Sequence, residues 1–158
     1  MKKLNESLML VANLSVVLGI IFLGVELRQN TRAIQAQTRD AITDKQMDYY
    51  ALTATDRPLA ELVVRIRNDD VSVDDLDAVD RFMFGSLWRV IVREWENSHY
   101  QYERGLFTPE EFEARLGTWR QSLATRAFRE NWENQRSNFS PSFRAEVDGL
   151  VSETGQAR

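Results

Sequence analysis

Residues 7 to 32 read SLMLVANLSVVLGIIFLGVELRQNTR, and this stretch decides how the rest of the chain is interpreted. No charged side chain occurs from Ser7 to Val25. At about 1.5 Å per residue, a helix of this length spans roughly 28 Å, which is close to the thickness of the hydrocarbon core of a bilayer. Its small and polar residues do not form one continuous stripe, so the helix is apolar on nearly all sides. The stretch therefore predicts a transmembrane helix.

Two other kinds of helix pass a simple test of apolar length: the central helix of a soluble fold and a cleaved signal peptide. The remaining chain is too short to enclose such a helix completely. A signal peptide has a shorter apolar region and a small-x-small cleavage site, whereas Gly-Val-Glu-Leu-Arg follows here. Twelve Leu, Ile, Val and Phe side chains outweigh one Asn and two Ser in the free energy of insertion. Both alternatives are therefore disfavoured.

The composition excludes several functional classes. The 158 residues include 24 acidic and 20 basic side chains, and this mildly acidic balance argues against a general nucleic-acid binder, which needs excess Lys and Arg. The chain has no cysteine, so disulfides, thiolate nucleophiles, Cys-ligated zinc and iron–sulfur clusters are excluded. We expect no cofactor.

We predict an all-α protein in which one N-terminal transmembrane helix continues into a helical bundle. The predicted segments are a tail and transmembrane helix over residues 1–27, a bundle domain over 28–153 and a disordered tail over 154–158. Residues 26–54 lack Pro and Gly, so the helix is expected to continue from the membrane into water.

Start and stop signals divide the bundle into further helices. Asp56 is an expected N-cap before Pro58, and Ser72 is another. Gly105 is expected to end the long aromatic helix in a left-handed conformation, and Thr108 opens a capping box. The predicted helices cover residues 59–67 and 73–104, a fourth up to residue 123, a fifth with Ala127, Phe128 and Trp132, and a sixth that begins at Ser140 and Pro141.

Large aromatic side chains recur at helical spacing in the bundle. In the third helix, Phe84, Trp88, Ile91, Trp95 and Tyr102 are predicted to face inward. Large aromatics dominate the burial of protein cores, so the main expectation for the tryptophans is a packed interior. The alternative is a pocket for an apolar ligand or lipid. The candidate pocket or core residues are Trp88, Trp95, Trp119 and Trp132.

The sequence contains no complete catalytic or metal-binding motif. His99 follows Glu96 in a Glu-x-x-His spacing, but a di-iron bundle needs two such motifs and the chain has one histidine. The acidic run after Asn68 fails as a calcium loop, because counting from Asp70 places Asp75 where Gly is needed and Arg81 where Glu is needed. No Gly-x-Ser-x-Gly, Walker or dinucleotide motif occurs. We therefore expect a protein that is not an enzyme.

The predicted span contains residues suited to helix association. Ser15 and Gly19 form a small-xxx-small pair that lets two backbones approach, and Asn13 can hydrogen-bond across a contact. These three are the candidate helix–helix interface. A homo-oligomeric channel is a further alternative, but Asn13 and Ser15 lie about 200° apart around a helix, so they do not form one polar lining.

The run Leu27-Arg28-Gln29-Asn30-Thr31-Arg32 directly follows the apolar helix, Gly105-Leu106-Phe107 ends the aromatic helix, and Trp132, Phe139 and Phe143 come later. With these features, most of the chain resembles an uncharacterised family of small bacterial single-span membrane proteins. The resemblance implies a single-span helical protein and brings no catalytic activity. The N-terminus departs from it by carrying Lys2 and Lys3.

These observations lead to one expected role, that of a membrane-anchored interaction module in the bacterial inner membrane. The expected partners are membrane lipid and other membrane protein subunits or further copies of the chain. Basic residues after the span slightly outnumber those before it, which favours a cytoplasmic C-terminal domain. The candidate partner-facing residues are Arg28, Gln29, Asn30 and Arg32.

Overall fold

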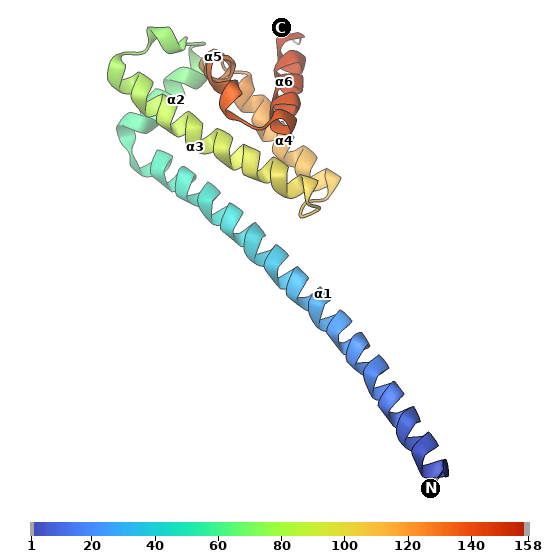
Figure 1. Ribbon diagram of the computed structural model, residues 1–158. Coiled ribbons are helices and arrows are strands. Elements are labelled where there is room, and N and C mark those ends of the chain that lie inside the picture. The colour runs from blue at the N-terminus through green and yellow to red at the C-terminus, as the bar shows by residue number, and fades with distance from the viewer. Residues whose placement is uncertain (1, 157–158) are drawn as a thin grey trace. The chain divides into compact units, whose positions relative to one another are not determined.

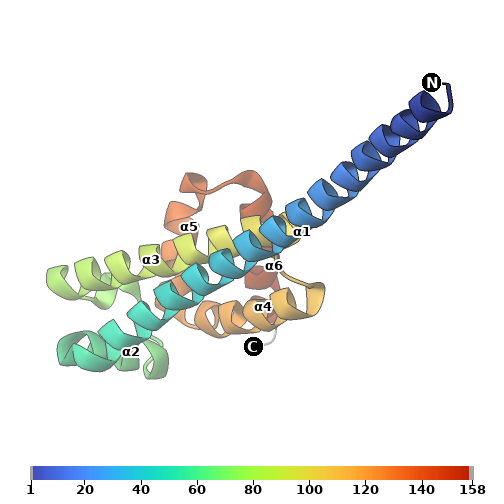
Figure 2. The same cartoon turned by 90° about the horizontal axis from the view of Figure 1, so that it is seen from below.

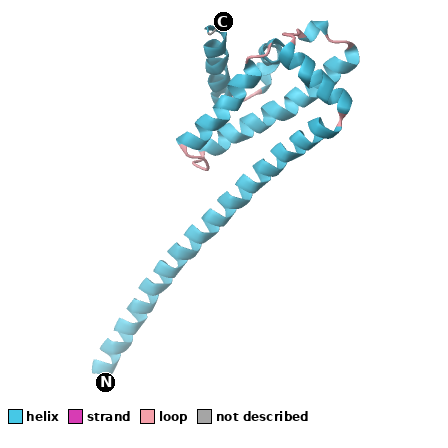
Figure 3. Ribbon diagram, turned by 180° about the vertical axis from the view of Figure 1, so that it is seen from behind, coloured by secondary structure: helices cyan, strands magenta, loops and turns pink. Residues whose placement is uncertain are grey.

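The computed structural model describes residues 2–156 of the chain, and it describes the side chains of residues 8–155. This part of the chain contains helices and no strand, which confirms the predicted all-α class (Figures 1 and 3). The elements are α1 (Lys2–Thr55), α2 (Arg57–Asn68), η1 (Val73–Asp75), α3 (Ala78–Glu103), α4 (Pro109–Leu123), α5 (Arg126–Gln135), η2 (Arg136–Asn138) and α6 (Pro141–Gln156), where η denotes a short 3₁₀ helix.

The chain forms two compact units, residues 1–41 and residues 42–158, and the boundary falls inside α1. This boundary is defined by contacts within the chain. The predicted boundary after residue 27 marks the point at which a helix would leave a bilayer, and it stays a prediction.

Helix α1 is uninterrupted from Lys2 to Thr55, as the absence of Pro and Gly after Gly24 predicts. In the first unit, every described side chain from residue 8 to residue 37 is exposed. In the second unit, Ile42 is only 2 % exposed and belongs to the hydrophobic core. The helix ends before Asp56, whose carboxylate accepts a hydrogen bond from the Leu59 N–H at 3.0 Å and caps α2 as predicted.

The second unit is a helical bundle built around α3, which contacts α2, α4, α5 and α6 (Figure 2). Its core is largely aromatic. Phe84, Trp88 and Trp95 of α3 are buried as predicted, but Ile91 and Tyr102 are only half-buried. The other buried residues of α3 are Leu87, Val92, Ser98 and His99.

The start of α3 differs from the prediction of one helix over 73–104. Ser72 is a cap as predicted, but it caps the 3₁₀ helix η1. The carboxylate of Asp77 then accepts hydrogen bonds from the N–H groups of Val79 and Asp80, both at 2.9 Å, and starts α3 at Ala78. Between the two caps, Leu76 is extended and buried. Two strong N-cap residues five positions apart divide the segment, and the burial of Leu76 stabilises the break.

The connection from α3 to α4 follows the predicted signals. Gly105 has a φ of 77°, and its N–H donates to the Tyr102 carbonyl at 2.8 Å. The Leu106 N–H donates to the Gln101 carbonyl at 2.9 Å, which completes a Schellman motif. Thr108 and Glu111 then form the predicted reciprocal capping box.

The last helix is longer than expected. Helix α6 continues to Gln156, so the beginning of the predicted disordered tail, residues 154–156, is helical. Residues 157 and 158 and the side chains of Lys2 and Lys3 lie outside the described part of the chain.

Candidate functional site

The apolar part of α1 presents its side chains to the surroundings on all sides. From Leu8 to Val25, the twelve Leu, Ile, Val and Phe side chains are between 49 % and 71 % exposed. By length and composition, α1 is able to cross a membrane, and none of its most apolar window is buried within the chain. A core helix of a soluble protein would be mostly buried, whereas a signal sequence meets the same test.

The three residues predicted as a membrane interface do not share one face of α1. Ser15 and Gly19 are one helical turn apart and lie on the same side. Asn13 lies about 200° from Ser15 in a regular helix. The Ser15 hydroxyl donates to the Val11 carbonyl at 2.9 Å, and a Cβ added to Gly19 would meet nothing within 4 Å. The span therefore offers two candidate faces.

The polar segment that follows is equally open. Arg28, Gln29, Asn30 and Arg32 are all exposed, and no hydrogen bond or ion pair described for this part of the chain engages their side chains. They sit on an uninterrupted helix, which holds them in a rigid arrangement. Their role as partner-facing residues remains a prediction.

The four tryptophans form the core of the bundle. Trp88, Trp95, Trp119 and Trp132 are at most 3 % exposed. Trp95 stacks on Trp119 with the ring centroids 5.0 Å apart. The Trp88 indole N–H donates to the Phe128 carbonyl at 3.3 Å, and the Trp132 indole N–H donates to Asp148 at 2.9 Å. The packing of the four rings and the satisfied donors of Trp88 and Trp132 are those of a folded core.

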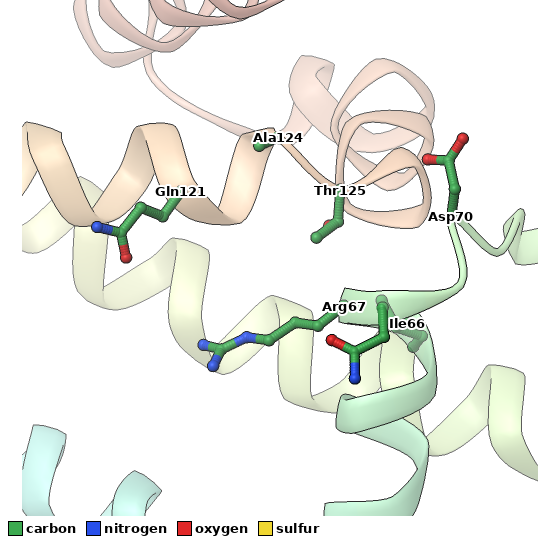
Figure 4. A pocket seen from close by; sticks show the side chains of 7 residues that line it. Ile66, Arg67, Asp70, Gln121, Ala124 and Thr125 are labelled. Carbon is green, nitrogen blue, oxygen red and sulfur yellow. The ribbon is translucent and has the colours of Figure 1, made fainter.

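The bundle carries surface hollows, and the two most distinct among the described residues are not lined by tryptophan. One, of about 460 Å³, lies between the end of α2 and the connection from α4 to α5, and the other, of about 440 Å³, lies between α4 and α6. Figure 4 shows the first, with Arg67, Asp70, Gln121 and Thr125 at its edge. These hollows give no support to an apolar pocket formed by the tryptophans.

A polar network links α1, α3 and α4, and sequence reasoning missed it. One Glu94 carboxylate oxygen accepts hydrogen bonds from Gln46 at 3.1 Å and Ser98 at 2.7 Å. The Arg115 guanidinium lies 3.5 Å from the same oxygen and 3.3 Å from the Ser98 hydroxyl. The guanidinium also lies over the Phe107 ring, 4.3 Å from its centroid. Only the Glu94–Ser98 spacing of four residues was visible in the sequence; Gln46 and Arg115 carry no such signal.

His99, the histidine of the Glu-x-x-His spacing, is a buried core residue. Its side chain is 8 % exposed and meets the edges of the Phe112 and Phe143 rings, with centroids 6.1 Å and 5.8 Å away. Glu103 is its nearest carboxylate at 3.9 Å. Among the described residues, no group of three or more His, Cys, Asp or Glu side chains is arranged to hold a metal ion.

A second polar cluster ties α5 to η1. Glu130 accepts hydrogen bonds at 2.8 Å from the Ser72 hydroxyl and from the Val73 N–H, and it pairs with Arg126 at 2.8 Å. Burial of Glu130 is the largest influence and by itself raises its pKa. The hydrogen bonds and the arginine together outweigh it, so the pKa of Glu130 lies below its ordinary value. This cluster is structural, because it holds the buried Ser72 in place.

Residues 8–37 of α1 form an exposed helix that is apolar up to Val25 and polar after it, whereas the bundle has a packed hydrophobic core. The distinctive surface of the chain is α1 from Leu8 to Gln37, where no described side chain is buried. In comparisons with protein-family models, curated proteins and solved structures, the chain matches none.

Proposed function

We propose that this chain is a non-enzymatic, membrane-anchored interaction module, in which residues 1–27 anchor a helical domain to a bilayer. The observation that carries the proposal is that every uncharged side chain from Leu8 to Val25 is exposed. Apolar surface in water is unfavourable by about 25 cal/mol per Å². A bilayer covers such a helix on every side, while the helix satisfies its own backbone hydrogen bonds.

The bundle supports this division of roles. Its apolar side chains from α2 to α6 pack against one another, with Trp88 and Val92 fully buried. The core takes nothing from residues 8–25. The apolar helix is therefore available for a partner outside the bundle, which is what an anchor requires.

We further propose a single-pass protein of the bacterial inner membrane with a cytoplasmic bundle. Arg28, Arg32 and Arg39 follow the span closely, and their number favours the cytoplasmic side for the C-terminal domain. The exposed polar segment after the span would contact a larger membrane complex or another copy of the chain.

Membrane fractionation with mass measurement tests the anchor. The full-length chain is expected in the membrane pellet after an alkaline carbonate wash and in the supernatant only after detergent is added. Its intact mass is expected to include residues 1–27, because an anchor is retained and a signal peptide is removed. Recovery of the intact chain as a monomer in the washed, detergent-free supernatant would contradict the proposal, as would a chain that lacks the apolar segment.

Two further measurements test location and association. A single cysteine at exposed Ser137 is expected to react with a membrane-impermeant maleimide only after spheroplasts are lysed, since the chain has no cysteine of its own. Labelling in intact spheroplasts would show that the bundle lies on the opposite side of the membrane.

Purification in mild detergent is expected to retain a protein partner or a second copy of the chain. A lone monomer would contradict the interaction role.

A further inference from the structure

A narrow stripe of mostly apolar residues runs along one side of α1, from the end of the uncharged stretch into the polar segment that follows it. Ile20, Gly24, Leu27, Thr31 and Ile34 follow one another at intervals of four, three, four and three residues. This spacing keeps them on one side of a helix and is the pattern of a coiled-coil contact. All five residues are exposed, with Ile20 at 64 %, Leu27 at 68 % and Ile34 at 55 %. We call these five residues the seam.

We propose that the seam binds the seam of a second copy of this chain in parallel, so that anchored chains associate through α1. This inference rests on the proposed membrane anchor, because the bilayer is what aligns two copies in the same direction. Leu27 and Ile34 would then face their own counterparts, and Gly24 would allow the two backbones to approach closely where they leave the bilayer.

The charges around the seam select a copy of the chain as its occupant. In a parallel coiled coil, each residue beside the contact lies next to a residue five positions away in the other helix, so Arg28 would lie beside Leu23 and Asn30 beside Gln35. The flanking residues are Asn30, Gln35 and Gln37, which are neutral and able to hydrogen-bond, with Arg28 as the one charge. Residues Glu26 and Arg32 lie away from the seam in the heptad. Two copies of the chain can therefore pair along the seam without bringing like charges together.

The seam also contains no donor that pairing would leave unsatisfied. The Thr31 hydroxyl donates to the Leu27 carbonyl at 2.9 Å within its own helix. Burial of Thr31 against a second copy therefore costs no lost hydrogen bond.

The opposite face of the span is a poorer site for the same partner. Ser15 and Gly19 begin a stripe that continues through Phe22 to Glu26 and Gln29. In a parallel pair, Glu26 would face Glu26 of the other copy just outside the bilayer, and such like-charge contacts are destabilising. The seam is therefore favoured over the small-xxx-small face.

Single-cysteine cross-linking in isolated membranes tests the seam. The chain has no cysteine, so each introduced thiol reports on one position. The seam variants are Leu27→Cys, Thr31→Cys and Ile34→Cys, and the matched variants on the other side of the same helix are Glu26→Cys, Gln29→Cys and Ala33→Cys. After oxidation, disulfide dimers are expected to be about fivefold or more abundant for the seam variants, because a disulfide needs Cα atoms less than about 7 Å apart.

A charge placed in the seam provides a second readout. In the Leu27→Cys chain, Ile34→Lys is expected to reduce dimer formation about fivefold, because it brings like charges together. Ala36→Lys, two residues away and outside the contact, is expected to leave it unchanged.

The possible outcomes separate this inference from the proposed anchor. Strongest cross-linking at Glu26, Gln29 and Ala33, or equal or absent cross-linking at all six positions, would overturn the seam. If the chain nevertheless remains in the carbonate-washed pellet of the same samples, the anchor stands without the seam. Release of the chain into the washed supernatant would instead contradict the anchor.

Discussion

The first unit of α1 and helix α3 are both rich in apolar residues, but they use them differently. From Leu8 to Val25 the large apolar side chains of α1 are at least 49 % exposed, whereas Trp88 and Val92 of α3 are fully buried. In α3 the buried apolar residues gather on one side, and Phe82, Arg89 and Arg93 lie exposed outside it. A helix that is apolar on one side packs that side against other parts of the same fold. A helix that is apolar on all sides needs an apolar environment such as a bilayer.

The same contrast occurs within α1 itself. Ile34 is 55 % exposed and Ile42 is 2 % exposed, although both lie on one uninterrupted helix. Ile42 belongs to the bundle core, and Gln46 beyond it donates to Glu94. Helix formation therefore does not by itself determine which residues are buried; neighbouring elements do.

The largest expected effect comes from charging the span. Replacement of Leu14 and Leu18 by arginine is expected to cost about 5–7 kcal/mol of insertion free energy, at about 2.5–3.5 kcal/mol for each arginine near the centre of a bilayer. The chain should then leave the carbonate-washed pellet. The volume-conserving change of both residues to methionine should not alter fractionation. If the chain with both arginines stayed in the washed pellet, the apolar side chains of α1 would not be what anchors it, and the contrast with α3 would fail.

The next effect compares two aromatic residues of α3. Trp88→Ala is expected to destabilise the bundle by about 3–5 kcal/mol, because it empties a fully buried site. Phe82, which is 76 % exposed, should change stability by no more than about 0.5 kcal/mol when replaced by alanine. Thermal unfolding of the detergent-solubilised chain, followed by near-UV circular dichroism, measures both. Similar losses for the two variants would show that the core is not where the structure places it.

A smaller effect is expected from the network that includes Gln46. Arg115→Met leaves Glu94, whose side chain is 16 % exposed, without its cation, at a cost of about 1–3 kcal/mol. Arg120→Met on the same helix should cost less than about 1 kcal/mol, because the partners Glu113 and Glu153 are exposed. Hydrogen exchange should also become faster around residue 46 in the first variant alone. Equal exchange in both would mean that the network does not hold this part of α1.

The smallest effect concerns pH. Because the pKa of folded Glu130 lies below its ordinary value of 4.5, its ionised form stabilises the fold above that pH, and this contribution is lost as the pH falls through the folded pKa. Glu130→Gln should therefore cost about 1 kcal/mol at pH 7 and progressively less below about pH 4.5. Unfolding measured from pH 7 to pH 3 checks this, with exposed Glu133→Gln as the control. A pH-independent loss would show that the charge of Glu130 is unimportant.

Local signals in the sequence predicted the boundaries of most helices. Gly105, Thr108 and Asp56 act through hydrogen bonds to residues at most four positions away, so their patterns can be read directly. The error at the start of α3 arose because Ser72 and Asp77 are both good caps. The burial of Leu76 accompanies a second helix start, and that burial depends on distant residues.

The candidate site was only partly predictable. The apolar span and the exposed residues after it follow from sequence alone, because they depend on no contact elsewhere in the chain. The buried position of His99 between Phe112 and Phe143 and the convergence of Gln46 and Arg115 on Glu94 do not. These groups are brought together by helices whose packing has no short-range signature.

By itself, the sequence determined the all-helical class, a helix long and apolar enough for a bilayer, and the absence of any cysteine chemistry, because composition, periodicity and caps act over a few residues. The tertiary structure alone decided which side chains of α3 are enclosed, that the four tryptophans form a packed core, and which face of α1 meets the bundle after Ala41. Those outcomes depend on contacts between residues far apart in the chain, and only the folded arrangement of all the helices determines them.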